Sequence, residues 1–428
     1  MIYLDHAATS PMPPAVRSAY LAALEVVGNP SSIHSAGQRA RALVDDARAR
    51  IAATLGVDPI EVTFTGGGTE AVNLAIKGLW WMRNQGAAPA GTPAAGSAGS
   101  AAGAVRSAPL PRPRILVPRA EHHAALDAVE WLAAHEGAEL RWLEVDALGA
   151  LRLDDLADAL GDGSEVALLT MLAANNEVGT LQPVAEAAAL AAAVGVPVHV
   201  DAIAAYGQVP LSPLPQGVSA VSVSAHKVGG PVGVGALVLR RGAEVVPLLH
   251  GGSQQRGRSG TMDAAGAEAF AVAAELAHAE LAGHKRMLRA RLAEGIRSRV
   301  PQAVLRGAAG AAAVATDPAR GAVLDALALP GTLHLTVPDA EGDSLLMLLD
   351  AAGIAVSTGS ACQAGVPEPS HVLLAMGLTE AEARGALRIT LGSSTTEGDV
   401  DALLDALPAA VERAQAAGLA ARTPRLGR

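Results

Sequence analysis

One of the few lysines in this chain lies where a primary amine could take part in covalent chemistry. Of the 32 basic side chains among 428 residues, only Lys77, Lys227 and Lys285 are lysines. Lys227 follows a β-rich run and precedes Gly229-Gly230-Pro231, which predicts a strand end beside a sharp backbone turn. A lysine amine can lose its proton and form a Schiff base with an aldehyde cofactor, whereas a guanidinium stays charged. The ordinary alternative is a surface lysine that caps a strand. Lys77, at a helix end, and Lys285, in a charged surface run, fit that alternative better.

Two further stretches supply what a pyridoxal phosphate type of cofactor needs besides an amine. Asp201 ends the run of residues 197–201, and a carboxylate at a strand's carboxyl end faces the crevice where α/β sheets bind ligands. It could keep a pyridine nitrogen protonated, although a helix N-cap is an equally ordinary role. The turn Thr65-Gly66-Gly67-Gly68-Thr69-Glu70 lies between a predicted strand and helix, where free N–H groups and the helix dipole favour an anion. It lacks the Gly-Lys-Ser/Thr of a Walker motif.

Three other kinds of residue could contribute to such a site. His122 and His123 open a predicted helix, and either could stack on a ring or cap the helix. Cys362 is the only cysteine, which excludes an internal disulfide and a metal site built wholly from this chain's thiolates. It lies among small residues, which predicts an exposed loop whose thiol is either reactive or merely tolerated. Arg388 stands among apolar neighbours and suits bidentate binding of a substrate carboxylate.

The elements that must position these residues alternate along the first half of the chain. Short β-rich runs separated by helical patterns predict an α/β domain with a mostly parallel sheet. The predicted strands are residues 61–65, 114–118, 166–172, 197–200, 220–224 and 235–239, with helices at 38–55 and 69–83. A long helical pattern follows at 263–300, then strands at 332–337 and 387–391 and helices at 341–352, 379–384 and from 397 onward. We expect a large domain at 14–262 and a smaller α+β domain at 263–428, completed by residues 1–13.

Composition argues against several classes of function. The formal net charge is −10 without a cluster of basic residues, so nucleic acid is not expected as a direct partner. No stretch offers about 20 continuous apolar residues for a bilayer, and no signal peptide is visible, so a cytoplasmic protein is expected. Residues 85–113 are nearly all Gly, Ala, Pro and Ser, which predicts a mobile surface loop and a neutral low-complexity insertion.

Together the motifs resemble those of the NifS/IscS-type cysteine desulfurases, which are class V aminotransferases. The matching stretches occur in the family's order and cover nearly the whole chain outside the insertion. They are Tyr3-Leu4-Asp5-His6-Ala7-Ala8-Thr9, Gly28-Asn29-Pro30-Ser31-Ser32, residues 64–70 and 73–78, Glu121-His122, Asn175-Asn176-Glu177-Val178-Gly179, His199-Val200-Asp201-Ala202, Ser224-Ala225-His226-Lys227, Arg258-Ser259-Gly260-Thr261 and Gly359-Ser360-Ala361-Cys362. The resemblance implies the fold-type I architecture of pyridoxal phosphate enzymes and a homodimer.

The same resemblance implies a role for each candidate residue. Lys227 would hold pyridoxal 5'-phosphate, Asp201 would pair with its ring nitrogen, and His122 would cover the ring and move protons. The phosphate would be held by Gly68, Thr69, Ser224 and His226, and by Thr261 of the other subunit. Asn176 would lie near the phenolic oxygen. The substrate carboxylate would be bound by Asn29 and Arg388. Cys362 would take sulfur from L-cysteine as a persulfide, leaving L-alanine. A sulfur-acceptor protein, of iron–sulfur cluster assembly or tRNA thiolation, would then receive the sulfur.

The chain departs from the family pattern at three places. Ala204 stands where a glutamine usually hydrogen-bonds the phenolic oxygen, residues 254–258 are one residue short before Ser259, and the insertion is extra. The shortening bears on the placement of Thr261. Two alternatives therefore stay open. One is a selenocysteine lyase or another class V aminotransferase-like enzyme, and an aminotransferase would have no need of Cys362. The other is a catalytically retired scaffold protein, which Ala204 suggests.

Overall fold

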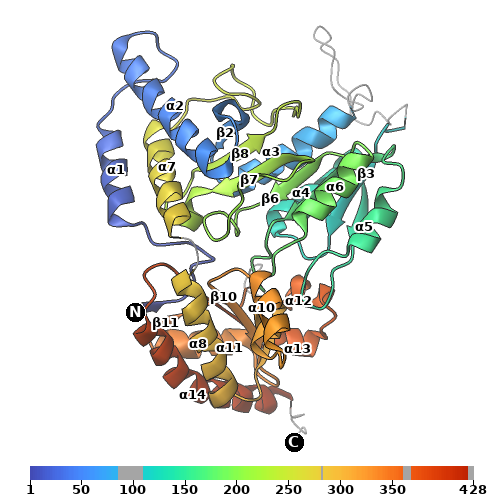
Figure 1. The fold of residues 1–428 in the computed structure, drawn as a ribbon, viewed down its shortest axis with the longest axis vertical. Coiled ribbons are helices and arrows are strands. Elements are labelled where there is room, and N and C mark those ends of the chain that lie inside the picture. Colours follow the sequence, from blue (N-terminus) through green and yellow to red (C-terminus); the bar gives the residue numbers. More distant parts are fainter. Residues whose placement is uncertain (85–108, 281–282, 360–367, 423–428) are drawn as a thin grey trace, which may run out of the picture.

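The computed structural model describes residues 1–84, 109–280, 283–359 and 368–422 (Figure 1). Most of the predicted insertion, residues 85–108, lies outside the described residues, and so does Cys362. The described residues form a larger part around one wide sheet and a smaller part around a narrow one. None of the described helices combines the length and the apolarity that a bilayer crossing requires.

A mostly parallel sheet forms the centre of the larger part, as predicted. Over the described residues its seven strands are arranged in the order β2-β8-β7-β6-β5-β3-β4. Their bounds are β2 Val62–Thr65, β3 Arg114–Pro118, β4 Glu139–Leu143, β5 Val166–Leu172, β6 Val198–Asp201, β7 Val218–Ser224 and β8 Gly235–Leu239. Strands β3 to β7 pair in parallel, and β8 runs antiparallel to β2 and β7. Strand β5 is buried at every residue, which explains why its sequence is a nearly continuous apolar run.

Helices cover both faces of this sheet. On one face lie α3 Gly68–Arg83 and α4 His123–Glu136, which share a core with the strands. On the other lie α1 Pro14–Leu24, α2 Ser35–Leu55, α5 Leu153–Leu160, α6 Val184–Ala193 and α7 Ala264–Ala279. In a parallel sheet covered in this way, the carboxyl ends of the strands open onto one edge, and ligands bind there.

The smaller part surrounds an antiparallel sheet of the order β12-β10-β9. Its strands are β9 Val304–Arg306, β10 Thr332–Thr336 and β12 Ala386–Thr390, and its helices are α8 Gly283–Arg299, α9 Gly307–Ala313, α10 Pro318–Ala326, α11 Gly342–Ala351, α12 His371–Ala375, α13 Glu380–Arg384 and α14 Glu397–Arg422. The N-terminal strand β1 Ile2–Tyr3 pairs with β11 Ile354–Ala355, and Leu4 is fully buried in this second core. The first residues of the chain therefore pack with the last part of it, as expected from the sequence.

The long helix predicted at residues 263–300 differs in the structure. It is two helices, α7 and α8, and they pack in different cores. Because α7 packs against α1 and α2, the first core does not end at residue 262, and we place the boundary between α7 and α8. Strand β4 escaped prediction because it lies at the sheet edge, where partial exposure removes the continuous apolar pattern.

Candidate active site

A cavity of about 430 Å³ lies between the two parts, at the carboxyl ends of the central strands. Residues of both parts line it, together with the N-terminal segment. The predicted site residues among its lining are Gly68, Thr69, His122, Asn176, Asp201, Ser224, His226, Lys227 and Arg388. These residues are spread over more than 300 positions of the chain, so folding alone brings them to one cavity.

Lys227 reaches this cavity from a short 3-10 turn, Ala225–Val228, that follows β7 directly. Gly229 ends the turn with a φ of 85°, a conformation that favours glycine. The Lys227 amine donates to the carbonyl oxygens of Ala7 at 2.5 Å and Ala8 at 3.1 Å. Burial, reinforced by the nearby Arg388 charge, lowers the pKa of Lys227 to about 8. The neutral, nucleophilic form of the amine is thus accessible near physiological pH.

Asp201 is the last residue of β6 and is buried, with 2% of its surface exposed. Its Oδ1 accepts a hydrogen bond from the Ile203 amide at 3.0 Å. Burial raises the pKa of this carboxyl to about 6, although the Ile203 amide and the Lys227 charge both oppose the rise. A cationic group that enters the cavity would stabilise the charged form of this buried carboxylate.

An anion would fit at the start of α3. Gly67 precedes the helix with a φ of 137°, and no side chain caps the helix there. A Cβ on Gly68 would lie 2.4 Å from the Ile203 Cδ1 and 3.3 Å from the Ser224 Cβ, so glycine is required for this close approach. The Ser224 hydroxyl is buried and has no hydrogen-bond partner among the described residues. Uncapped amides, a helix dipole and an unused hydroxyl together suit a phosphate.

His122 has the capping role that its sequence position allowed, and it also faces the cavity. It caps α4, because its Nδ1 accepts a hydrogen bond from the Ala124 amide at 3.1 Å, and its ring also lines the cavity. Burial lowers the pKa of His122 to about 4, with a further lowering from the Lys227 charge. The ring is therefore neutral at physiological pH, and its proton lies on Nε2 because Nδ1 is the acceptor.

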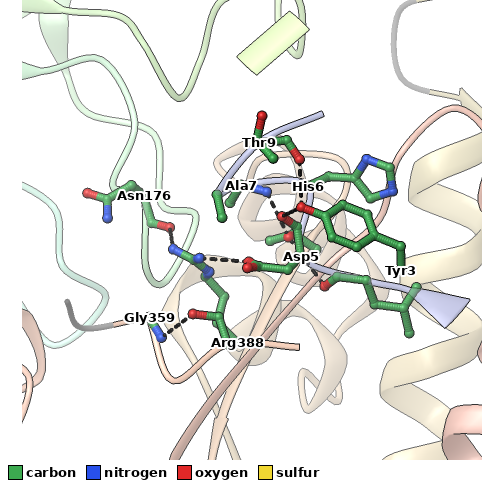
Figure 2. A network of polar contacts seen from close by, with 12 residues as sticks. Tyr3, Asp5, His6, Ala7, Thr9, Asn176, Gly359 and Arg388 are labelled. Atoms are coloured by element: carbon green, nitrogen blue, oxygen red, sulfur yellow. Dashed lines mark hydrogen bonds and ion pairs between the residues drawn. The ribbon is translucent and has the colours of Figure 1, made fainter. Parts of the chain in front are cut away.

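Arg388 is a buried cation on β12, and the smaller part of the fold contributes it to the cavity lining. One of its terminal nitrogens donates to the Asn176 carbonyl oxygen at 2.9 Å, and the other pairs with the Asp5 carboxylate at 3.0 Å (Figure 2). Its Nε–H is buried without a hydrogen-bond partner among the described residues. The guanidinium is thus fixed by two contacts and retains hydrogen-bonding capacity for a carboxylate.

The N-terminal segment is the part of the site that sequence reasoning missed. His6, Ala7 and Ala8 line the cavity, and Asp5 holds Arg388. The motif of residues 3–9 contributed to the family resemblance, but it carried no chemical role because its residues act mainly through backbone carbonyls and an ion pair. Neither kind of contact has a local sequence pattern.

Two predicted residues are not in the lining of this cavity. Asn29 is exposed, and its Oδ1 accepts from the Ser31 amide within a local turn at 2.9 Å. Thr261 is exposed on the loop before α7.

Lys285 does not have the surface position expected for it, whereas Lys77 is partly exposed but lies inside its helix and not at its end. Lys285 is buried, with 6% exposed, and its amine donates to the Gln208 Oε1 at 2.7 Å. Lys77 lies within α3, and its amine sits 4.4 Å from the centre of the Trp131 ring. The prediction for Lys285 was wrong because a charged run says nothing about which turn of a helix faces a neighbouring part of the fold.

Both flanks of the segment that carries Cys362 contact the larger part near the cavity. Gly359 lines the cavity, and a Cβ on it would lie 3.5 Å from the Glu177 carboxylate. On the other flank, the Ser370 hydroxyl donates to the Glu177 Oε2 at 2.5 Å. His371 adds a hydrogen bond between its Nε2 and the Glu121 carbonyl oxygen at 2.8 Å. The described residues on either side of this segment therefore contact Glu177 and Glu121 of the larger part.

Comparison with known proteins agrees with this geometry. The family model of class-V aminotransferases matches residues 2–88 and 94–403. An IscS-like cysteine desulfurase of Mycobacterium tuberculosis is 48% identical over 98% of this chain and 99% of its own length. The cysteine desulfurase IscS of Methanosarcina thermophila is 36% identical over 96% of this chain and 92% of its own. Among solved structures, a NifS-like protein superposes with a TM-score of 0.79 at 31% identity, covering 96% of this chain and 99% of that one.

Proposed function

This chain belongs to the class-V aminotransferase family and, within it, to the cysteine desulfurases, and we propose that it works with pyridoxal 5'-phosphate held by Lys227. The observation that carries the proposal is the arrangement around one amine. A half-buried lysine of lowered pKa, a buried acid and an uncapped helix start share a single cavity.

The residues present fit this cofactor. The amides at the start of α3 with the unused Ser224 hydroxyl suit its phosphate, joined by Thr69 and His226. Asp201 suits its ring nitrogen, since a pyridinium would supply the cationic partner that the buried carboxylate lacks. When bound, pyridoxal phosphate withdraws electrons from the α-carbon of the amino acid attached to it. Asn176 would lie near the phenolic oxygen.

The chain's own groups then handle the substrate. Arg388 would bind the carboxylate of L-cysteine through the donors that Asp5 and Asn176 leave free. The Lys227 amine, once released, would accept the α-proton, a task for which a pKa of about 8 is well matched near neutral pH. His122 is neutral and would cover the ring face while offering its Nε2 proton for return to carbon.

Sulfur removal is assigned to Cys362. Its thiolate would attack the sulfur of L-cysteine, so that an S–S bond forms as the C–S bond breaks. The electron pair of the broken bond stays with carbon, which takes up a proton and leaves as L-alanine. L-Cysteine and a thiol thereby become L-alanine and a persulfide, and no external oxidant is needed. The persulfide sulfur would pass to an acceptor protein.

The proposed active form is a homodimer in the cytoplasm. The exposed Thr261, away from its own cavity, supports a phosphate contact across a subunit interface, and Asn29 would serve the substrate carboxylate in the assembled enzyme. A single cysteine that must stay a free thiol suits a reducing compartment.

Borohydride reduction of the loaded enzyme tests the cofactor assignment. Because the chain has only three lysines, peptide mapping after reduction identifies the labelled amine without ambiguity. We expect the label on Lys227, its loss in Lys227→Ala and its retention in the matched control Lys77→Ala. Label on another lysine, or none, would contradict the proposal.

The role of Cys362 has a separate test. Incubation with L-cysteine should yield alanine and protein-bound persulfide together, and Cys362→Ala should abolish both. Alanine formed by Cys362→Ala at the rate of the unmodified enzyme would exclude this thiol as the sulfur acceptor.

A further inference from the structure

An ion pair between Asp5 and Arg388 lies at the cavity, and it is largely shielded from solvent. The side chains are 18% and 6% exposed, and their positions differ by 383 residues along the chain. Figure 2 shows Arg388 held between this carboxylate and the Asn176 carbonyl oxygen. Arg388 lines the cavity but Asp5 does not, so Asp5 contacts the guanidinium without being part of the surface that a substrate would contact.

Asp5 is itself held firmly by its own segment. Its carbonyl oxygen accepts a hydrogen bond from the Tyr3 hydroxyl at 3.0 Å, and the same hydroxyl reaches the Thr9 carbonyl at 2.9 Å. Asp5 also bridges to Thr390, two residues beyond Arg388 on β12. A short rigid segment therefore presents the carboxylate to Arg388, and the next residues, Ala7 and Ala8, accept from the Lys227 amine.

We propose that Asp5 is a positioning residue for substrate recognition, which orients Arg388 toward the cavity so that the guanidinium binds the carboxylate of the amino-acid substrate. This inference rests on the proposed role of Arg388. The mechanism is geometric: Asp5 and Asn176 each occupy one terminal nitrogen, and together they prevent rotation of the planar guanidinium. A guanidinium that is already held in one orientation loses less conformational entropy when a carboxylate binds to it.

Asp5 also contributes a negative charge to the Lys227 amine. The charged groups around that amine are Arg388, which disfavours its protonation, and Asp201 and Asp5, which favour it. His122 and His226 also face it and are neutral near pH 7, because burial lowers the pKa of each to about 4. Geometry and charge can be separated by substitution, because Asn at position 5 keeps an acceptor oxygen and removes the charge.

Steady-state kinetics of the holoenzyme test the geometric role. Asp5→Ala should raise KM for L-cysteine about tenfold, the loss typical of a charged hydrogen bond, with kcat within about threefold. Asp5→Asn should restore KM to within about threefold of the unmodified enzyme. Asp317→Ala is the matched control, since it removes a carboxylate that only caps α10 and should leave KM unchanged. A KM unchanged in Asp5→Ala, or raised equally in Asp5→Asn, would overturn the inference.

A double-mutant cycle separates this inference from the proposed function. If Asp5 acts through Arg388, the KM of Asp5→Ala with Arg388→Ala should equal that of Arg388→Ala alone. Additive effects would overturn the inference and leave the role of Arg388 standing. An unchanged KM in Arg388→Ala would instead overturn the proposed role of Arg388 itself.

A titration of the cofactor-free chain provides a readout apart from activity. With three lysines, carbon-13 methylation of the amines produces few resonances, and that of Lys227 can be followed against pH. Asp5→Ala and Asp5→Asn should both lower the pKa of Lys227, because both remove the charge that favours its protonation. An unshifted titration in both variants would overturn the placement of Asp5 beside this site.

Discussion

At the scale of single residues, the site contains a base and an acid whose charged forms are both disfavoured by burial. Burial lowers the pKa of Lys227 to about 8 and raises that of Asp201 to about 6. Glu121, fully buried nearby, also has its pKa raised by burial, with the Asp201 charge adding to the rise. Such groups lower the stability of the folded chain without a ligand, and they favour binding of a ligand that supplies the opposite charge.

Asp201→Asn should stabilise the cofactor-free chain at alkaline pH. The raised pKa means that the folded state binds this proton more tightly, so stability is lost as pH rises from about 4 to about 6 and stays lower above that. Asn keeps the acceptor for the Ile203 amide and removes the charge, which should gain about 3 kcal/mol at about pH 8 and less than about 1 kcal/mol at about pH 4. Denaturant unfolding at both pH values measures the difference.

The same variant should weaken the holoenzyme. Without the carboxylate, the ring nitrogen loses its partner, and activity should fall at least about tenfold. A cofactor-free Asp201→Asn chain that unfolds more easily at about pH 8 would contradict the conclusion that burial disfavours the charged form of Asp201.

At the scale of elements, local chemistry at helix and strand ends accounts for much of the site. The start of α3 lacks a capping side chain, whereas α12 begins with a cap that has a second task. Ser370 caps α12 by accepting from the Leu373 amide, and its hydroxyl also donates to Glu177. Helix α12 follows the segment that carries Cys362, so this cap links the end of that segment to the larger part.

Ser370→Ala should therefore slow sulfur transfer more than it harms the fold. Losing a cap costs about 1 kcal/mol, and Thr379→Ala, which removes the cap of α13, should cost the same. Only Ser370→Ala should lower kcat, on the order of 3-fold, because releasing this flank from Glu177 lowers the effective concentration of the Cys362 thiol at the cavity. Single-turnover persulfide formation measures this rate. Equal rates for the two variants would show that Glu177 does not anchor the segment.

At the scale of the whole molecule, the larger and the smaller part meet at the cavity, and neither Asn84 nor Arg112, at the two ends of the insertion, belongs to the cavity lining. The flanks of the insertion are joined by reciprocal hydrogen bonds between the Asn84 side chain and the backbone of Arg112, at 2.9 and 3.0 Å. These bonds join the described residues on the two sides of residues 85–108.

Replacing residues 85–108 with a short Gly-Ser linker should leave the enzyme intact. KM and kcat should stay within about twofold, and the free energy of unfolding should be unchanged or rise by at most about 1.5 kcal/mol, since a shorter loop costs less entropy to close. Kinetics and denaturant unfolding of the shortened chain measure both. A large loss of activity in a stably folded variant would assign the insertion a function.

Much of the fold followed from local pattern. Strands 114–118, 166–172 and 235–239 were predicted to the residue, because strands buried on both faces have nearly continuous apolar sequences. The split between α7 and α8 was missed, since both helices have helical periodicity and only their packing in separate cores distinguishes them. Lys227 and Asp201 were expected at strand ends and Gly68 and Thr69 at a glycine turn, and all four line the cavity.

The sequence by itself determined which chemistry is present: a strand-end lysine, a strand-end acid, a glycine turn before a helix and one thiol. These are local features, and backbone sterics and side-chain chemistry act over a few residues. Tertiary structure alone decided that Asp5 holds Arg388 across 383 residues, that Lys285 is buried, and that Lys227 and Asp201 titrate far from their usual range. The physical reason is that ion pairing and desolvation depend on what surrounds a group in space, which no short stretch of sequence contains.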